Sequence, residues 1–133
     1  MILGTADGPP PKIPEGEYTI GFLRAETGIL RGKRRVFLWF RIVDPGEHVG
    51  KELYLCCPVP ENGKFGMGSK LVEAWRIAKG QWPTRRDRLS VNVFRGLYFR
   101  AAIKTVMKNQ DGEERPVDQH YSKIDHLIER INS

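Results

Sequence analysis

The chain has 133 residues, of which 40% are hydrophobic and 29% are charged. This size favours one domain with a core of its own, and the composition is that of a water-soluble globular protein. No apolar run approaches the ~18 residues that span a bilayer, and the first residues lack the pattern of a secretory signal. We therefore expect a cytoplasmic protein that does not enter a membrane.

The net charge of +6 is distributed unevenly along the chain. Residues 110–133 hold six acidic and three basic residues, a net charge of −3, which leaves +9 on residues 1–109. A basic body favours a polyanionic partner, although many basic proteins bind none.

The beginning of the chain, residues 1–14, is rich in glycine and proline and has little to bury. We expect a flexible arm there, followed by a single domain over residues 15–133. Period-two alternation predicts strands over residues 17–24, 36–43 and 51–59. Residues 25–35 are predicted to form an exposed turn between the first two strands.

The second predicted strand carries the most informative pattern. Its even positions, from Val36 to Ile42, are all apolar and suit a core, because alternate side chains of a strand point to opposite faces. The other face carries Phe37, Trp39 and Arg41, and pairing with the third strand adds Tyr54. Either ring is also compatible with burial under another part of the fold. Four cations precede this strand in the sequence: Arg31, Lys33, Arg34 and Arg35.

A helix is predicted over residues 70–79, with Ser69 as its N-cap and Gly80 as its stop. The glycine-rich residues 63–70 before it can hold an anion at the helix N-terminus, although a flexible connector is the simpler interpretation. Residues 81–88 form a second basic loop with one aromatic, Trp82. A short strand or an approach to one is expected over residues 89–93.

A fourth strand is predicted over residues 97–107, with Tyr98 and Arg100 facing outward. A fifth strand is expected near residues 116–121. From Ser122 the apolar positions change to helical spacing, which predicts a short amphipathic C-terminal helix. Its stripe consists of Ile124, Leu127, Ile128 and Ile131.

This order of elements predicts a mainly β protein: a five-stranded OB-fold-like barrel with a helix between strands 3 and 4. The OB-fold is a partly open barrel that binds oligonucleotides or oligosaccharides on its strand 2–3 face and the adjoining loops. On this interpretation, the rings of the second and third strands lie on the binding face, and the basic turn lies beside it.

Three short motifs resemble small phage and mobile-element proteins of the single-stranded-DNA-binding OB type. They are Pro14-Glu-Gly-Glu-Tyr18, Phe40-Arg-Ile-Val-Asp44 and Gly50-Lys-Glu-Leu-Tyr54. The likeness covers about residues 14–107. It implies the same fold and a single-stranded DNA partner.

Sequence motifs of catalysis are absent. The three histidines lack a metal-ligand spacing, and the adjacent Cys56 and Cys57 fit neither a disulfide framework nor a metal knuckle, so we interpret them as reduced strand residues. There is no phosphate-loop or nucleophile-elbow motif. We expect no enzyme activity, cofactor or metal. A magnesium-dependent nuclease that uses the scattered carboxylates is an alternative that no pairing of acids in the sequence supports.

The leading hypothesis is a binder of single-stranded DNA, or of RNA, in which rings stack on bases and cations neutralise phosphates. The predicted stacking residues are Phe37, Trp39, Tyr54 and Tyr98. The predicted phosphate-binding residues are Arg31, Lys33, Arg34, Arg35, Arg41 and Arg100. The alternative is a protein–protein adaptor or inhibitor of a mobile element that uses the same rings as hot spots. A binder of duplex or structured RNA is a third possibility, and self-assembly of several copies stays open.

Overall fold

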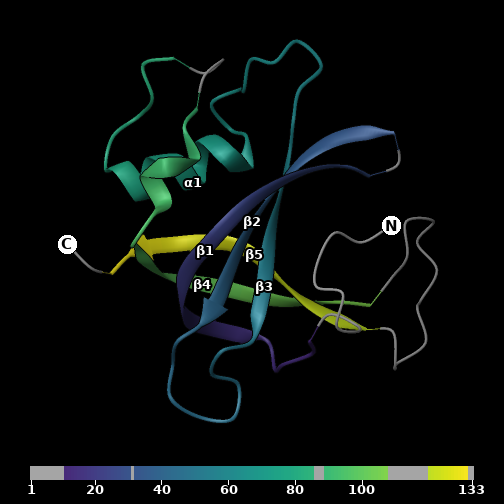
Figure 1. Cartoon of the computed structure of the whole chain (residues 1–133), viewed down its shortest axis with the longest axis vertical. Helices are drawn as coiled ribbons and strands as arrows, with labels where there is room; N and C mark the ends of the chain where they lie inside the picture. The colour runs from purple at the N-terminus through teal and green to yellow at the C-terminus, as the bar shows by residue number, and fades with distance from the viewer. Residues whose placement is uncertain (1–10, 31, 86–88, 108–119, 132–133) are drawn as a thin grey trace.

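The computed structural model describes residues 11–30, 32–85, 89–107 and 120–131 (Figure 1). Its elements, in chain order, are β1 (Gly16–Leu30), β2 (Lys33–Ile42), β3 (Glu52–Pro58), α1 (Lys70–Lys79), the 3-10 helix η1 (Val91–Phe94), β4 (Tyr98–Val106) and β5 (Tyr121–Arg130). The five strands form one antiparallel sheet in the order β3-β2-β1-β4-β5. The predicted mainly β fold, with one helix between β3 and β4, is confirmed.

The long strand β1 joins the two halves of the sheet. It pairs with β4 over Gly16–Gly21 and with β2 over Ile20–Leu30, and the register with β2 shifts between Phe22 and Arg24. A bulge of this kind bends a strand and increases its twist. Figure 1 shows the resulting curve of β1 across the molecule.

The sheet is not closed into a barrel by strand pairing. Its edge strands are β3 and β5, and the described residues form no hydrogen-bonded ladder between them. The two edges nevertheless touch, because the Tyr54 hydroxyl donates to the Tyr121 hydroxyl across 3.4 Å. The predicted barrel is therefore present only as a curved open sheet whose edges come together.

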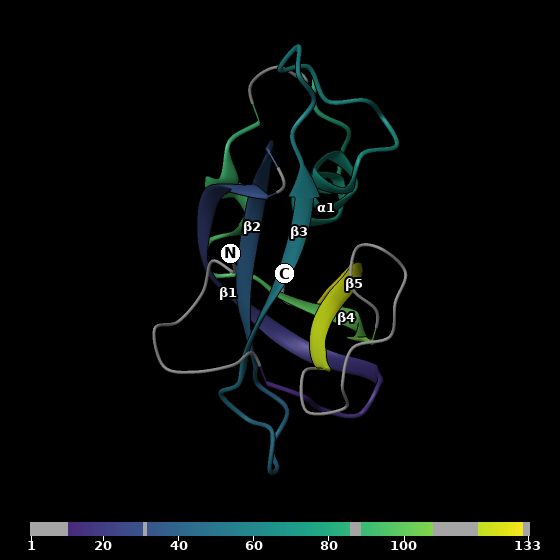
Figure 2. The ribbon, with the colours of Figure 1, turned by 90° about the vertical axis from the view of Figure 1, so that its right-hand side faces the viewer.

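The core lies between the concave face of the sheet and α1. Leu38, Phe40 and Ile42 of β2 are buried there as predicted, together with Phe99 of β4. The helix occupies its predicted residues and lies beside the end of β3 (Figure 2). The Ser69 side chain accepts a hydrogen bond from the Val72 amide, and Gly80 ends the helix at a φ of 82°. These caps fix both ends of the helix.

The prediction of a C-terminal helix is wrong, because residues 121–130 form the edge strand β5. Two register irregularities in the β4–β5 pairing explain the misleading spacing. Ala101 pairs with Leu127 and Ile103 pairs with Ile124. The two β4 residues are two positions apart, whereas their two β5 partners are three positions apart. The extra residue of a bulge thus turns a period of two into a spacing of three, which resembles a helix.

The predicted exposed turn over residues 25–35 is also wrong. Most of that segment continues β1 and β2 as a long hairpin, with Thr27 opposite Val36 and Leu30 opposite Lys33. Gly32 lies in the connection with a φ of 74°, a left-handed conformation that favours glycine. The cations Lys33, Arg34 and Arg35 therefore lie on a strand and point to alternate sides of it.

Two other segments differ from the predictions made for them. The short strand expected over residues 89–93 is replaced by η1. The fifth strand expected near residues 116–121 falls largely on residues 116–119, outside the described part of the chain.

The end of the predicted N-terminal arm is anchored in the structure. Ile13 is buried, and its amide donates to the Ser122 hydroxyl at 2.8 Å. The same hydroxyl donates to the Ile13 carbonyl at 3.1 Å, and the Ser122 amide donates to the Pro11 carbonyl at 2.9 Å. Residues 1–10 of the arm lie outside the described part.

Replacing Ser122 with alanine should destabilise the fold, because it leaves the buried Ile13 amide and carbonyl without their partner. A buried polar group without a partner costs about 1–3 kcal/mol. Urea unfolding followed by circular dichroism measures the loss. Thr27→Ala, at an exposed position of β1, should change stability by about 0.5 kcal/mol or less. Equal stability of the two variants would contradict the anchoring role of Ser122.

Candidate nucleic-acid interface

A basic groove of about 750 Å³ lies between the start of β2, the end of β3 and the first turn of α1. Four cations line it: Lys33, Arg34, Arg35 and Lys70. Glu61 is the acidic residue of the lining. The rest of the wall is formed by Gly32, Pro58, Val59, Pro60, Gly66, Gly68 and Ser69.

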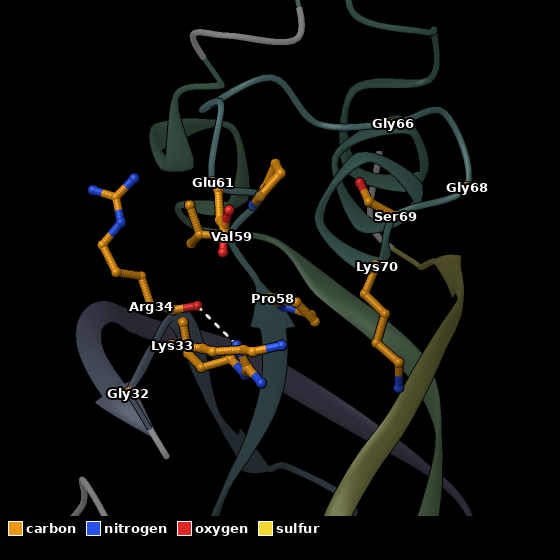
Figure 3. A pocket seen from close by; sticks show the side chains of 12 residues that line it. Gly32, Lys33, Arg34, Pro58, Val59, Glu61, Gly66, Gly68, Ser69 and Lys70 are labelled. Atoms are coloured by element: carbon orange, nitrogen blue, oxygen red, sulfur yellow. Dashed lines mark hydrogen bonds between the residues drawn. The ribbon is translucent and has the colours of Figure 1, made fainter.

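The cations enter the groove from two directions. Figure 3 shows Lys33 reaching from β2 across the end of β3, and Lys70 descending from α1 on the opposite side. The Arg34 guanidinium points outward, while its carbonyl accepts a 3.0 Å hydrogen bond from the Arg35 guanidinium. Because the strand β2 and the capped helix α1 hold these residues, the groove is defined by regular structure.

The charge of the groove lining is predominantly positive. Among the described residues, none of the four cations forms an ion pair with a carboxylate. Lys70 instead donates to the Asp125 carbonyl oxygen at 2.8 Å. The N-terminus of α1, which opens at Ser69, adds the partial positive charge of its helix dipole. The groove therefore suits an anion.

The predicted phosphate-binding residues separate into two groups. Lys33, Arg34 and Arg35 lie together in the basic groove, while Arg31 lies outside the described residues. Arg41 and Arg100 lie elsewhere, near Gly21 in the middle of the sheet. Six residues along β2 separate Arg35 from Arg41, about 20 Å at ~3.3 Å per residue.

Lys70 was missed as a site residue by the sequence analysis. The sequence feature that could have identified Lys70 is the glycine-rich stretch before the helix. That stretch was interpreted as a connector. Only the folded chain shows that this helix begins opposite the β1–β2 hairpin, so that Lys70 faces the cations of β2.

The rings of the strand 2–3 face are together, as predicted, but they are not exposed. Trp39 pairs with Tyr54 across the two strands, and Tyr54 makes edge-to-face contacts with both Phe37 and Trp39 at 5.2 Å. The exposed fractions are 4% for Phe37, 4% for Trp39 and 9% for Tyr54. The expectation that these rings present open faces is wrong, because they pack on one another and on Leu23, Cys56 and Tyr121.

Arg24 covers the Trp39 ring from β1. Its guanidinium carbon lies 5.0 Å from the ring centroid, within cation–π range. Glu52 at 3.3 Å and Glu26 at 3.8 Å hold the guanidinium from two sides. A base cannot stack on Trp39 while Arg24 stays in this position, and the two carboxylates make the centre of the face less attractive to phosphate.

Tyr98 is the predicted stacking residue that keeps part of its surface exposed. It is opposite Gly21 in the β1–β4 pairing, and Arg41 is opposite the same glycine on the other side. A Cβ atom on Gly21 would lie 2.8 Å from Tyr98 Cε2, so the ring rests directly on the backbone of β1. Arg100, two residues along β4, donates to the Thr19 hydroxyl at 3.3 Å and lies 3.6 Å from Glu17.

Gly21→Ala should destabilise the protein, because the new methyl group displaces the Tyr98 ring. An overpacked site of this kind costs about 1–3 kcal/mol. The Tyr98→Ala background should reduce that cost, since the ring that clashes is gone. A double-mutant cycle of unfolding free energies measures the coupling. If Gly21→Ala costs the same in both backgrounds, the ring does not require the glycine.

The two cysteines occupy opposite faces of β3 and are free thiols, as predicted. Burial raises the pKa of the Cys57 thiol to about 12. Burial also raises the pKa of the Cys56 thiol, although the nearby Arg35, Lys123 and Lys70 act in the opposite direction. Burial thus disfavours the thiolate form of both groups, and the thiolate is the form that acts as a nucleophile.

Cys57 should resist thiol reagents in the folded protein at pH 8 and react once the protein is unfolded in urea. The Cys56→Ser variant leaves Cys57 as the sole thiol, and Ellman's reagent counts it in each state. Above pH 9 the unfolded thiol ionises while the folded one stays protonated, so the free energy of unfolding should fall as the pH rises toward 12. Fast labelling of the native variant would contradict the burial of this group.

No group of three or more His, Cys, Asp or Glu side chains in the described ranges could hold a metal ion. In the same ranges, no helix is long and apolar enough to cross a membrane. Comparison of this chain with protein-family models, with curated proteins and with solved structures finds no match.

Proposed function

We propose that this protein binds single-stranded nucleic acid, DNA in the first instance, without catalysing a reaction. The observation that carries the proposal is the basic groove, in which cations from β2 and α1 converge and form no ion pair with a carboxylate of the described residues. A sugar–phosphate backbone presents a row of negative charges and fits an open groove of this kind. Its phosphates would replace the counterions of Lys33, Arg35 and Lys70.

The fold supports the same proposal. The sheet order places β3 and β5 at edges that touch, and α1 follows β3. We propose that the sheet is an OB-type barrel, open at this junction. In OB-folds the strand 2–3 face and the adjoining loops bind oligonucleotides. The basic groove lies at the end of that face in this chain.

The half-buried Tyr98 extends the proposed path along the sheet. A strand that leaves the groove along β2 would reach the region of Arg41, Tyr98 and Arg100, about 20 Å away. Stacking on Tyr98 favours unpaired bases over a duplex, because a base in a duplex already stacks on its neighbours.

The buried ring cluster changes the role of Phe37, Trp39 and Tyr54 in this proposal. These buried rings stabilise the strand 2–3 face by packing, and the proposal does not require them to stack on bases. Their burial also weakens the protein-adaptor alternative, because that alternative used the same rings as exposed hot spots.

Lys33→Ala should weaken binding to a twelve-residue oligothymidylate and reduce its salt dependence. Each neutralised phosphate contributes about 0.7 log units of affinity per tenfold change in salt. Fluorescence anisotropy of a labelled oligonucleotide at several salt concentrations gives the slope. Lys104→Ala is the matched control, since Lys104 is an exposed lysine of β4 outside the groove.

The proposal requires the two lysine variants to differ. Identical slopes for Lys33→Ala and Lys104→Ala would show that charge acts without regard to position and that the groove is not the site. Absent or salt-insensitive binding by the unmodified protein would overturn the function itself. Binding that is stronger to a duplex of the same length would replace the single-strand assignment.

A further inference from the structure

Trp82 is the most exposed of the three tryptophans. Its exposed fraction is 46%, compared with 4% for Trp39, while Trp75 packs against the core. It lies two residues beyond Gly80, where α1 ends. Burial in the core therefore does not account for an indole at this position.

The side chain of Arg76 holds the indole from one side. The Arg76 guanidinium carbon lies 4.9 Å from the centroid of the Trp82 ring. The Arg76 carbonyl accepts a 2.8 Å hydrogen bond from the Gly80 amide, which closes the helix and directs the chain toward Trp82. One ring face is thus covered by a cation, and the remaining exposed surface is available to a second flat group.

The sequence that leads to and follows Trp82 is rich in cations. Residues 76–85 contain Arg76, Lys79 and Arg85 and no acidic residue. An indole backed by a guanidinium, with further cations nearby, has the chemistry of a base-stacking site beside phosphates. A neutral apolar ligand would gain no electrostatic attraction from these cations.

We propose that Trp82 stacks on a base of the nucleic acid whose backbone lies in the basic groove. This inference rests on the proposed function and adds a second contact to it. The groove meets α1 at its first turn, and Trp82 follows its last turn, so about 15 Å of helix separates them at ~1.5 Å per residue. That separation corresponds to about four nucleotides at the ~3.4 Å spacing of a stacked strand.

The deciding experiment compares Trp82→Ala and Trp82→Phe in the binding of labelled twelve-residue oligothymidylate. Loss of one stacked base costs about 1–3 kcal/mol, so the Kd of the alanine variant should rise on the order of 5- to 150-fold. The phenylalanine variant keeps a ring and should recover part of the affinity. The salt slope should stay unchanged in both, because no phosphate contact is removed.

Val49→Ala is the matched control for the loss of exposed apolar surface. Val49 is 53% exposed in the loop between β2 and β3, outside the groove, and its truncation should leave the Kd unchanged. Circular dichroism verifies that each variant is folded. An equal loss of affinity in Val49→Ala and Trp82→Ala would overturn the stacking role.

Intrinsic fluorescence gives an independent readout. Bound oligonucleotide should quench the wild-type protein and the Trp39→Phe variant, whose replaced ring is buried, but not the Trp82→Phe variant. Quenching that disappears with Trp39 and persists without Trp82 would overturn the inference. The inference would also be overturned if Trp82→Ala bound the oligonucleotide with the Kd of the wild-type protein. If the wild-type protein still showed the expected salt slope, that result would leave the proposed function intact.

Discussion

The shared strand β1 is the constraint on which the rest of the structure depends. One continuous strand pairs with β2 on one side and with β4 on the other, and the bulge after Phe22 lets it change direction between them. Its second half supports the β1–β2 hairpin that carries Lys33 and Arg35 to the groove. Its first half contains Gly21, on which Tyr98 rests. Both cationic regions are thus placed by the geometry of a single strand.

The centre of the outer sheet face and the basic groove differ in how far their charges are paired within the chain. At the centre, Arg24 is held by Glu26 and Glu52 over Trp39, so the charges there are largely satisfied within the chain. At the groove, the cations have no such partners among the described residues. A polyanion gains most where it does not have to displace an internal carboxylate, and this favours the groove over the aromatic centre.

Period-two alternation and helix capping were sufficient to predict much of the fold. The inward face of β2 and the caps of α1 at Ser69 and Gly80 follow from local sequence, and the structure confirms them. Alternation failed at β5, because bulges changed its period, and it did not show how far the hairpin extends beyond Ala25. It also identified which rings share a face without indicating that Arg24, from another strand, covers one of them.

The contrast between Trp39 and Trp82 shows why exposure is the harder quantity to predict. Trp39 shares its predicted strand face with Arg41, which suggested that the ring is exposed. In the structure, residues of neighbouring strands bury it. Trp82 follows the end of a helix, keeps 46% of its surface exposed, and has the Arg76 guanidinium over its ring. Both rings have an arginine above them, but two carboxylates fix Arg24, whereas no acidic residue occurs from 76 to 85. Under the proposed function, this difference in local acid content is the reason to place base stacking at Trp82 and not at Trp39.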